Sequence, residues 1–419
     1  MRKLTVKNFS VIKEAELEFG KITVLIGPQA GGKSLLCKLA YFCAQVVPEI
    51  IENYYNEHRS YDALVSRVAD EFAEKFPRDS WLEQSFKVQY RAKSFEVSIS
   101  EGTLLTGPRV DFPEEFENRS RLRATPKRAG FNYGSALPRD VRKRQELEGE
   151  RPFPPVVEES IYIPTGRAFY SIPNRAYMAL STKNLDWITQ RYAPEFDADY
   201  KALRELYESD SDICIEFADM ATQVLKGKVV SVEGRLLFES ANDSRRNPFE
   251  LLSSGTLELL PIINTLSQIV QNASEFKLAY VLVAPFGVVS IEEPELSIFP
   301  NTQNALVRML AWLSNTPFLD MSYTITTHSP YILTAFNNLI EAGQVARAKP
   351  ESKDEVAKLI AEHYWIKEGA FKAYAIEDGV LKSIVAEDTG LASANYLDQV
   401  SETIGAEFDE LLRLGYVES

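Results

Sequence analysis

The sequence predicts an α/β fold in which buried strands and helices alternate around a glycine-rich loop. An apolar, β-rich run at 22–26 leads into Gly27–Ser34, which reads G-x-x-x-x-G-K-S, and a stretch with helical apolar spacing follows from Leu35. Two further apolar runs, at 288–292 and 323–327, also end in polar or charged residues. A strand, a glycine loop and a helix in this order form the arrangement that binds phosphate.

The predicted loop supplies the groups that a bound nucleotide needs. Successive backbone N–H groups and the helix N-terminus attract phosphate, and glycine allows the close approach that a Cβ would block. Lys33 is expected to reach the outer phosphates, and the Ser34 hydroxyl to ligate Mg²⁺. A glycine-rich turn without nucleotide is the alternative, which motif and context together disfavour. The predicted nucleotide-binding residues are Gly27, Pro28, Gln29, Ala30, Gly31, Gly32, Lys33, Ser34 and Leu35.

Composition narrows the class of protein. The chain has 419 residues with 45% hydrophobic content, which suits one large domain or two modest ones. Its net charge of −14 argues against a general nucleic-acid binder, although a local basic site is compatible with it. Three unclustered cysteines indicate a reducing compartment. The polar N-terminus is unlike a signal peptide, and no apolar run approaches the roughly 20 residues that span a bilayer. We expect a cytoplasmic protein with no membrane contact.

Hydrophobic patterning divides the chain into five predicted regions. Alternating apolar residues predict two strands before residue 22, a meander at 86–105 and a hairpin at 228–238, with helices between them. The predicted regions are an N-terminal lobe with the phosphate loop and the start of the meander (1–106), a basic, proline-rich insertion (107–159), a helical subdomain with the hairpin (160–250), a C-terminal lobe (251–345) and a small C-terminal cap (346–419).

The insertion carries an unusual concentration of positive charge. Nine basic residues lie between Arg119 and Arg144, against the single acid Asp140, and apolar periodicity is missing. One interpretation is contact with nucleic acid or an acidic partner protein, and the other is a solvated loop. Charge alone does not separate them, so both stay open.

Three motifs follow in the second half. Ser253, Ser254 and Gly255 precede a helical pattern and offer hydroxyls, free N–H groups and a helix dipole to an anion, although alone they are only a good helix start. The apolar run 288–292 delivers Glu292 and Glu293 to its end. Glu292 is placed to hold Mg²⁺, and Glu293 to orient or deprotonate an attacking water, whereas the alternative is a pair of solvated acids.

The third motif and two isolated residues complete the set of candidates. His328 ends the run 323–327 and is placed to contact a γ-phosphate or its water. Arg167 follows an apolar strand at 160–164 and is expected to aim at the nucleotide or a neighbouring subunit, or to form a structural ion pair. Phe9 lies near the first turn, where a core position is favoured over stacking near an adenine.

Taken in order, these four motifs resemble those of the ATP-binding-cassette (ABC) class of ATPase, in its RecF/SMC-like and overcoming-lysogenization-defect (OLD) branch. The resemblance covers about 1–45 and 160–340, with a weaker likeness at 365–415. It implies an ABC-type P-loop NTPase head with a mixed central sheet, an antiparallel β-subdomain and a helical subdomain. It also implies ATP and Mg²⁺ as cofactors, with Mg²⁺ held by Ser34 and Glu292. Glu293 would be the catalytic carboxylate, His328 the switch histidine, and Ser253–Gly255 of one subunit would close over ATP held by another.

The chain departs from the usual pattern in three places. Glu292 stands where an Asp is usual, a substitution that recurs in the OLD-like branch. Gly31 stands where many relatives carry Ser, and no Asp-x-Asp strand of a Toprim nuclease follows residue 339. The resemblance therefore points to a standalone ATPase, similar to the ATPase subunits of the bacterial anti-phage systems PARIS and Septu. It implies a homo-oligomer and a separate Toprim or HNH effector nuclease. A phage trigger protein or DNA, bound through 119–144, would be a further partner. A RecF-like DNA-repair ATPase and a non-hydrolysing scaffold are the alternatives.

Overall fold

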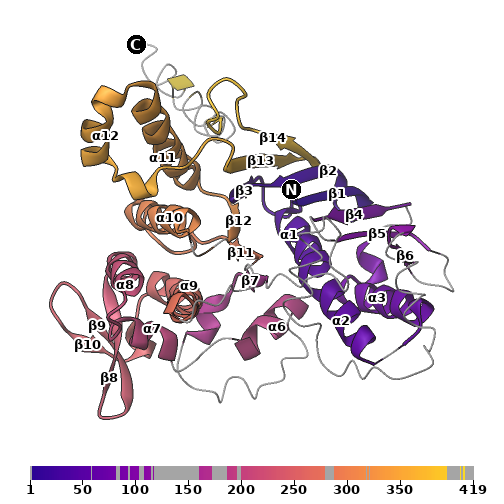
Figure 1. Cartoon of the computed structure of the whole chain (residues 1–419), viewed down its shortest axis with the longest axis horizontal. Helices are drawn as coiled ribbons and strands as arrows, with labels where there is room; N and C mark the ends of the chain where they lie inside the picture. Colours follow the sequence, from indigo (N-terminus) through magenta and orange to yellow (C-terminus); the bar gives the residue numbers. More distant parts are fainter. Residues whose placement is uncertain are drawn as a thin grey trace, which may run out of the picture.

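The structure, a computed structural model, describes residues 2–57, 59–81, 85–92, 95–102, 108–114, 117, 160–171, 186–195, 200–278, 287–317, 319, 321–393, 406, 409 and 410. The predicted basic block 119–144 and the predicted third strand of the meander at 103–105 lie outside these residues. Figure 1 shows the helices grouped around a large central sheet.

The described strands form one eleven-stranded mixed sheet and one three-stranded antiparallel sheet. The large sheet has the order β6-β5-β4-β1-β2-β14-β13-β3-β12-β11-β7. Its strands are β1 (Arg2–Phe9), β2 (Ile12–Phe19), β3 (Ile22–Ile26), β4 (Lys87–Arg91), β5 (Glu96–Ser100), β6 (Arg109–Asp111), β7 (Ile161–Ile163), β11 (Val288–Glu292), β12 (Ser322–Thr327), β13 (Phe371–Glu377) and β14 (Val380–Ser383). The small sheet contains β8 (Gly227–Val232), β9 (Arg235–Ser240) and β10 (Arg246–Asn247).

The large sheet combines two pairing modes. β13, β3, β12, β11 and β7 run parallel to one another, whereas β2, β1, β4, β5 and β6 form an antiparallel meander. The fold-class prediction of an α/β head with a mixed sheet, an antiparallel β-subdomain and a helical part is confirmed.

Helices cover both faces of the sheet. Side chains of Ile22, Val24 and Ile26 on β3 belong to one hydrophobic core, and Leu25 belongs to the other. Such continuous burial is typical of a parallel strand covered on both faces. The helices are α1 (Lys33–Tyr41), α2 (Val47–Asn56), α3 (Tyr61–Lys75), α6 (Trp187–Glu195), α7 (Lys201–Leu206), α8 (Asp212–Leu225), α9 (Ser254–Leu278), α10 (Pro300–Asn315), α11 (Pro330–Ala348) and α12 (Lys353–Leu359).

The segment after the phosphate loop corrects the expectation that no apolar segment of the chain is long enough to span a bilayer. Residues 33–54, in the part of the chain that the structure describes, are long and apolar enough to cross a membrane by length and composition. They comprise α1, a π-helical turn at Phe42–Val46 and most of α2. However, 67% of the most apolar window is buried inside the protein, because this segment packs in the core beside the sheet.

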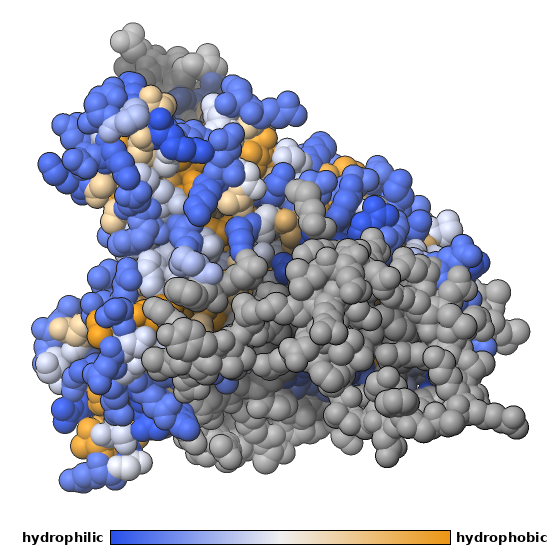
Figure 2. Space-filling model, in the orientation of Figure 1, coloured by the Kyte–Doolittle hydropathy of each residue, from blue (hydrophilic) through white to orange (hydrophobic). Residues whose placement is uncertain are grey.

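The sequence pattern predicted the hairpin between β8 and β9, but it did not predict where the C-terminal region lies in the fold. Glu233 and Gly234 both have positive φ, of 50° and 78°, as the predicted tight turn between β8 and β9 requires. The predicted C-terminal cap, in contrast, contributes strands to the central sheet, where β13 lies between β3 and β14. The surface over α11 and α12 is mainly hydrophilic in Figure 2.

Candidate functional site

The ends of three adjacent parallel strands bring the predicted chemistry together. The phosphate loop follows β3, Glu293 follows β11, and His328 follows β12. Lys33 Nζ lies 3.1 Å from His328 Nε2, and His328 Nε2 lies 3.4 Å from Glu293 Oε1. Residues almost 300 positions apart therefore share one polar cluster, as we expect when the carboxyl ends of parallel strands meet at one edge.

The phosphate loop depends on glycine at two positions. Gly27 has φ 152°, and a Cβ there would lie 2.7 Å from the carbonyl oxygen of Ile376 on β13. Gly32 has φ 103° and precedes α1, and a Cβ there would lie 2.3 Å from Ile12 Cδ1. Both side-chain-free positions let the loop fold tightly against β13 and the β1–β2 turn, which leaves its N–H groups arranged at a helix N-terminus.

Lys33 is buried, and its ammonium binds to the phosphate loop. Its Nζ donates to the carbonyl oxygens of Gly27 and Pro28, each at 2.9 Å, and contacts His328. A charged ammonium has three protons, and two of them go to these carbonyls. Burial lowers the pKa of Lys33, and the charges of Glu293 and Glu295 oppose that shift. An incoming phosphate would supply the ammonium with a stronger acceptor than either carbonyl.

Glu292 is held inside the protein by neutral donors. Its side chain accepts from the Tyr162 hydroxyl at 2.7 Å and from the Thr165 N–H and hydroxyl at 3.0 and 3.3 Å. Burial raises the pKa of Tyr162 well above its usual value, and the charge of Glu292 adds to the shift. Sequence reasoning missed Tyr162 and Thr165, although a tyrosine within an apolar strand that ends in Thr was a readable signal.

Glu293 occupies an unusual backbone conformation. Its φ is 39°, in the left-handed region that non-glycine residues rarely adopt. The Glu293 N–H donates to the Thr326 carbonyl at 2.8 Å, which anchors this turn to β12. Strain of this kind persists only where the surroundings hold it, and it gathers at functional sites.

A third carboxylate, which the sequence analysis did not single out, positions His328. Glu295 Oε1 accepts from the His328 backbone N–H at 2.6 Å. Its other oxygen, Oε2, is buried and has no hydrogen-bond partner within the described residues. A buried, unpartnered carboxylate oxygen beside Lys33 and His328 fits a site that a ligand completes. The signal was the repeated carboxylate of Glu292-Glu293-Pro294-Glu295.

Arg167 is buried inside its own chain. Its side chain is 0% exposed, and Nη1 and Nη2 donate to the backbone carbonyls of Glu292 and Glu293 at 2.6 and 2.9 Å. Burial lowers the pKa of Arg167, and the Glu258 charge opposes this. The geometry supports the interpretation as a structural ion pair, because the guanidinium contacts groups of its own chain.

Phe9 belongs to the core. It is 0% exposed, and its ring packs against those of Phe72, Phe76, Trp81 and Phe86 at centroid distances of 5.0–6.1 Å. The favoured sequence interpretation was a core residue, and an enclosed ring has no face left for an adenine.

Ser253, Ser254 and Gly255 lie at the start of α9, and each has a different environment. The Ser253 hydroxyl accepts from the Thr256 N–H at 3.3 Å and so caps the helix. Ser254 is exposed, whereas Gly255 is buried, and a Cβ on Gly255 would lie 2.5 Å from the Ser297 carbonyl oxygen. The motif therefore lies against the loop that follows β11.

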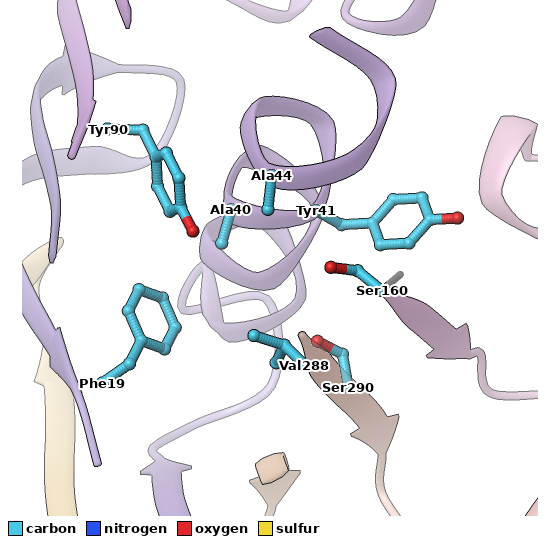
Figure 3. A pocket seen from close by; sticks show the side chains of 8 residues that line it. All are labelled: Phe19, Ala40, Tyr41, Ala44, Tyr90, Ser160, Val288 and Ser290. Carbon is cyan, nitrogen blue, oxygen red and sulfur yellow. The ribbon is translucent and has the colours of Figure 1, made fainter. Parts of the chain in front are cut away.

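A small cavity lies at the opposite, amino-terminal ends of β7 and β11. Figure 3 shows it between the helix after the phosphate loop and the sheet. Its volume of about 10 Å³ leaves room for one water molecule, so it is no candidate for a nucleotide. The lining residues are Phe19, Ala40, Tyr41, Ala44, Tyr90, Ser160, Val288 and Ser290.

Comparison with known proteins assigns the family. Residues 22–334 match the family described as "AAA domain, putative AbiEii toxin, Type IV TA system". The chain belongs to this AAA-domain family. The matched range contains the phosphate loop, the Glu292–Glu293 pair and His328, so the whole polar cluster lies within it. None of the curated proteins matches the chain.

Solved structures of low identity cover most of the chain. The SMC head domain from Thermotoga maritima is 12% identical, with a TM-score of 0.40 over 92% of this chain and 98% of that one. An SMC head bound to the C-winged helix domain of ScpA is 11% identical, with a TM-score of 0.42 over 91% and 96%. The recombination mediator RecF is 11% identical, with a TM-score of 0.35 over 91% and 97%.

Proposed function

We propose that this protein is an ABC-type ATPase that hydrolyses ATP to ADP and phosphate at sites shared between two copies of the chain. We further propose that it acts in anti-phage defence as a sensor and regulator of a separate effector nuclease. The observation that carries the ATPase proposal is the cluster of Lys33, His328 and Glu293 around the end of the phosphate loop.

Each residue of the cluster has a distinct role in this proposal. Lys33 would exchange its carbonyl acceptors for the outer phosphates and neutralise their charge. Glu293 would orient the attacking water, and His328 would contact the γ-phosphate. The hydrogen bond from the His328 backbone N–H to Glu295 fixes the position of His328 relative to the phosphate loop.

The proposal includes a bound Mg²⁺. The described residues hold no group of three or more His, Cys, Asp or Glu side chains that would form an all-protein metal site. Mg²⁺ in nucleotide sites takes one or two protein oxygens and completes its shell with phosphate and water. Ser34 and Glu292 would supply those oxygens, and Mg²⁺ would neutralise phosphate charge.

The exposed surface around the start of α9 supports a second copy of the chain as the partner. Leu251 and Phe299 are 74% and 73% exposed, and the tight contact of Gly255 with Ser297 places their segments side by side. Large apolar side chains exposed at the surface are typical of a contact surface. In the proposed assembly, Ser253 and Ser254 would contact ATP held by the other copy.

The proposed role in defence rests on one further observation. The family description names a toxin of a type IV toxin–antitoxin system. In this proposal the nuclease, of Toprim or HNH type, is a separate polypeptide. A phage protein would be the trigger.

Glu293→Gln tests the ATPase proposal. Wild type is expected to release phosphate from ATP with Mg²⁺, whereas Glu293→Gln binds ATP, does not hydrolyse it and accumulates as the assembled form in native mass measurements. Glu341→Gln, an exposed change on α11, is the matched control and keeps wild-type turnover. Normal turnover by Glu293→Gln would exclude the catalytic assignment.

A second measurement separates defence from DNA repair. A RecF-like function requires DNA affinity that falls steeply with salt and disappears when the arginines at 119–144 are neutralised. A defence function requires stable co-purification with the product of a neighbouring gene. DNA binding without such a partner would favour repair.

A further inference from the structure

One short segment joins the start of α9 to the end of β11. This bridging segment, residues 164–171, follows β7 and includes a 3-10 turn at Arg167–Tyr170. Thr165 holds the Glu292 carboxylate, and Arg167 and Ser171 reach α9. Its two contact surfaces belong to elements that the proposed function places in different ATP sites.

Toward β11, Arg167 holds the backbone on both sides of the strained turn. Nη1 donates to the Glu292 carbonyl at 2.6 Å and also to the Pro164 carbonyl at 3.0 Å, and Nη2 donates to the Glu293 carbonyl at 2.9 Å. The planar guanidinium holds both carbonyls, and Glu293 has a positive φ between this clamp and Thr326. A shift of the guanidinium therefore moves the peptide that carries the catalytic carboxylate.

Toward α9, the same side chain holds the second turn of the helix. Arg167 Nε donates to the Glu258 carbonyl at 3.0 Å and lies 3.4 Å from Glu258 Oε2. Pro261 lacks an N–H, so the Leu257 carbonyl four residues earlier has no donor within the helix. The Ser171 hydroxyl donates to that carbonyl. Glu258 stands one helical turn after Ser254, so motion at the helix start reaches Arg167 directly.

Burial makes the connection through Arg167, between α9 and the end of β11, rigid. Arg167 is 0% exposed and the Glu258 side chain is 12% exposed. A buried charge that loses its partner is strongly unfavourable, so guanidinium, helix and strand end have to move together. Packed and hydrogen-bonded contacts of this kind transmit displacement between elements.

We propose that Arg167 is a positioning residue that transmits engagement of α9 to the backbone of Glu293. The proposal rests on the proposed function, since α9 contacts ATP of the other copy there. Each subunit would then align its own Glu293 only after its α9 has engaged the partner's ATP. Hydrolysis at the two sites is thereby coupled, although Arg167 touches neither nucleotide.

Arg167→Lys tests this, because lysine keeps the charge and loses the planar fork. Turnover per site should fall at least about fivefold, the lower end of measured couplings between sites. The Kd for ATP should not change, because Arg167 makes no contact with the phosphate loop. Arg308→Lys is the matched control and should retain turnover. Arg308 is a partly buried arginine on α10 that lies over the ring of Tyr364.

A double-mutant cycle with Ser254→Ala separates transmission from simple support. If Arg167 passes on what α9 senses, the double variant is no slower than the slower single variant. If the two fold-losses multiply, or Arg167→Lys keeps wild-type turnover, the inference is wrong. Inactive wild type would instead refute the proposed ATPase, so the two failures are distinguishable.

Glu258→Gln keeps the test valid if Arg167→Lys does not fold. It leaves the clamp on Glu292 and Glu293 in place and removes only the charged partner on α9. The same loss of turnover, with unchanged ATP affinity and the same non-additivity with Ser254→Ala, is expected. Additive losses or wild-type turnover in a folded Glu258→Gln protein, judged by its thermal melting, would overturn the inference.

Discussion

Phe9 and Arg167 were both candidates for the nucleotide site, and the structure buries both completely. Their surroundings differ. Phe9 lies among rings from α3 and the neighbouring loops, whereas Arg167 lies among backbone carbonyls at the end of β11 and on α9. Burial therefore does not separate a functional residue from a core residue, but the chemistry of the neighbours does.

The two regions also contribute to stability in opposite ways. The aromatic cluster removes apolar surface from water and gains edge-to-face contacts. The region of Lys33, Arg167 and Glu292 removes charges from water, which costs free energy that hydrogen bonds offset only in part. A protein keeps such an arrangement where function requires it. Substitutions in the two regions should therefore have different readouts.

The largest effect is expected from Phe9→Ala. Deleting a fully buried ring should lower the free energy of unfolding by about 3–5 kcal/mol, because a cavity remains among four aromatic neighbours. ATP affinity of the folded protein should stay at the wild-type value. Leu359→Ala, at an 80% exposed position, should change stability by less than about 0.5 kcal/mol. Weakened ATP binding by folded Phe9→Ala would return Phe9 to the nucleotide site.

Lys33→Ala should show the reverse pattern. Loss of the ammonium should weaken ATP binding by about 100-fold or more, equivalent to about 2.7 kcal/mol. Thermal stability without nucleotide should hardly fall, because a desolvated charge disappears together with its hydrogen bonds. Titration calorimetry with ATP measures the effect. Lys38 lies on the same helix as Lys33 and forms a surface ion pair with Asp186. Lys38→Ala, which breaks this pair, should keep wild-type affinity. Retained affinity in Lys33→Ala would contradict the assigned phosphate loop.

Gly255→Ala probes the contact between α9 and the loop after β11. The added Cβ would lie 2.5 Å from a backbone oxygen, so the loop has to move, at a cost of about 1–3 kcal/mol. ATP-driven assembly, followed by native mass, should weaken while ATP binding to the monomer stays. Gly343→Ala in α11, with 3.2 Å to its nearest atom, is the control. Unchanged assembly in a folded Gly255→Ala protein would exclude this loop from the interface.

Tyr162→Phe should have an effect on stability no larger than that of Gly255→Ala. It removes one donor to the buried Glu292 carboxylate, which should cost about 1–3 kcal/mol of stability and raise the Mg²⁺ concentration needed for half-maximal turnover. Phosphate release measured across a Mg²⁺ series shows the shift. Tyr323→Phe alters another buried tyrosine, whose hydroxyl faces Met321, and should leave the Mg²⁺ requirement unchanged. An equal shift in both variants would mean that Tyr162 does not tune Glu292.

Local patterns predicted much of the fold and most of the polar cluster. The strand–loop–helix unit, the first two strands of the predicted meander and the tight turn at Glu233-Gly234 are all present in the described structure. So are the strand ends that carry Glu293 and His328. These features depend on residues within one or two elements, and parallel strands then bring their ends to one edge of the sheet.

The sequence by itself determined which elements form and which groups end the strands, because periodicity, glycine loops and capping residues act over short distances. Only the tertiary structure decided where Arg167 points, that Tyr162, Thr165 and Glu295 support the cluster, and that β13 enters the sheet beside β3. Arg167 contacts carbonyls 91, 125 and 126 residues away. Backbone carbonyls are alike in every residue, so no sequence pattern names the ones a buried guanidinium will find.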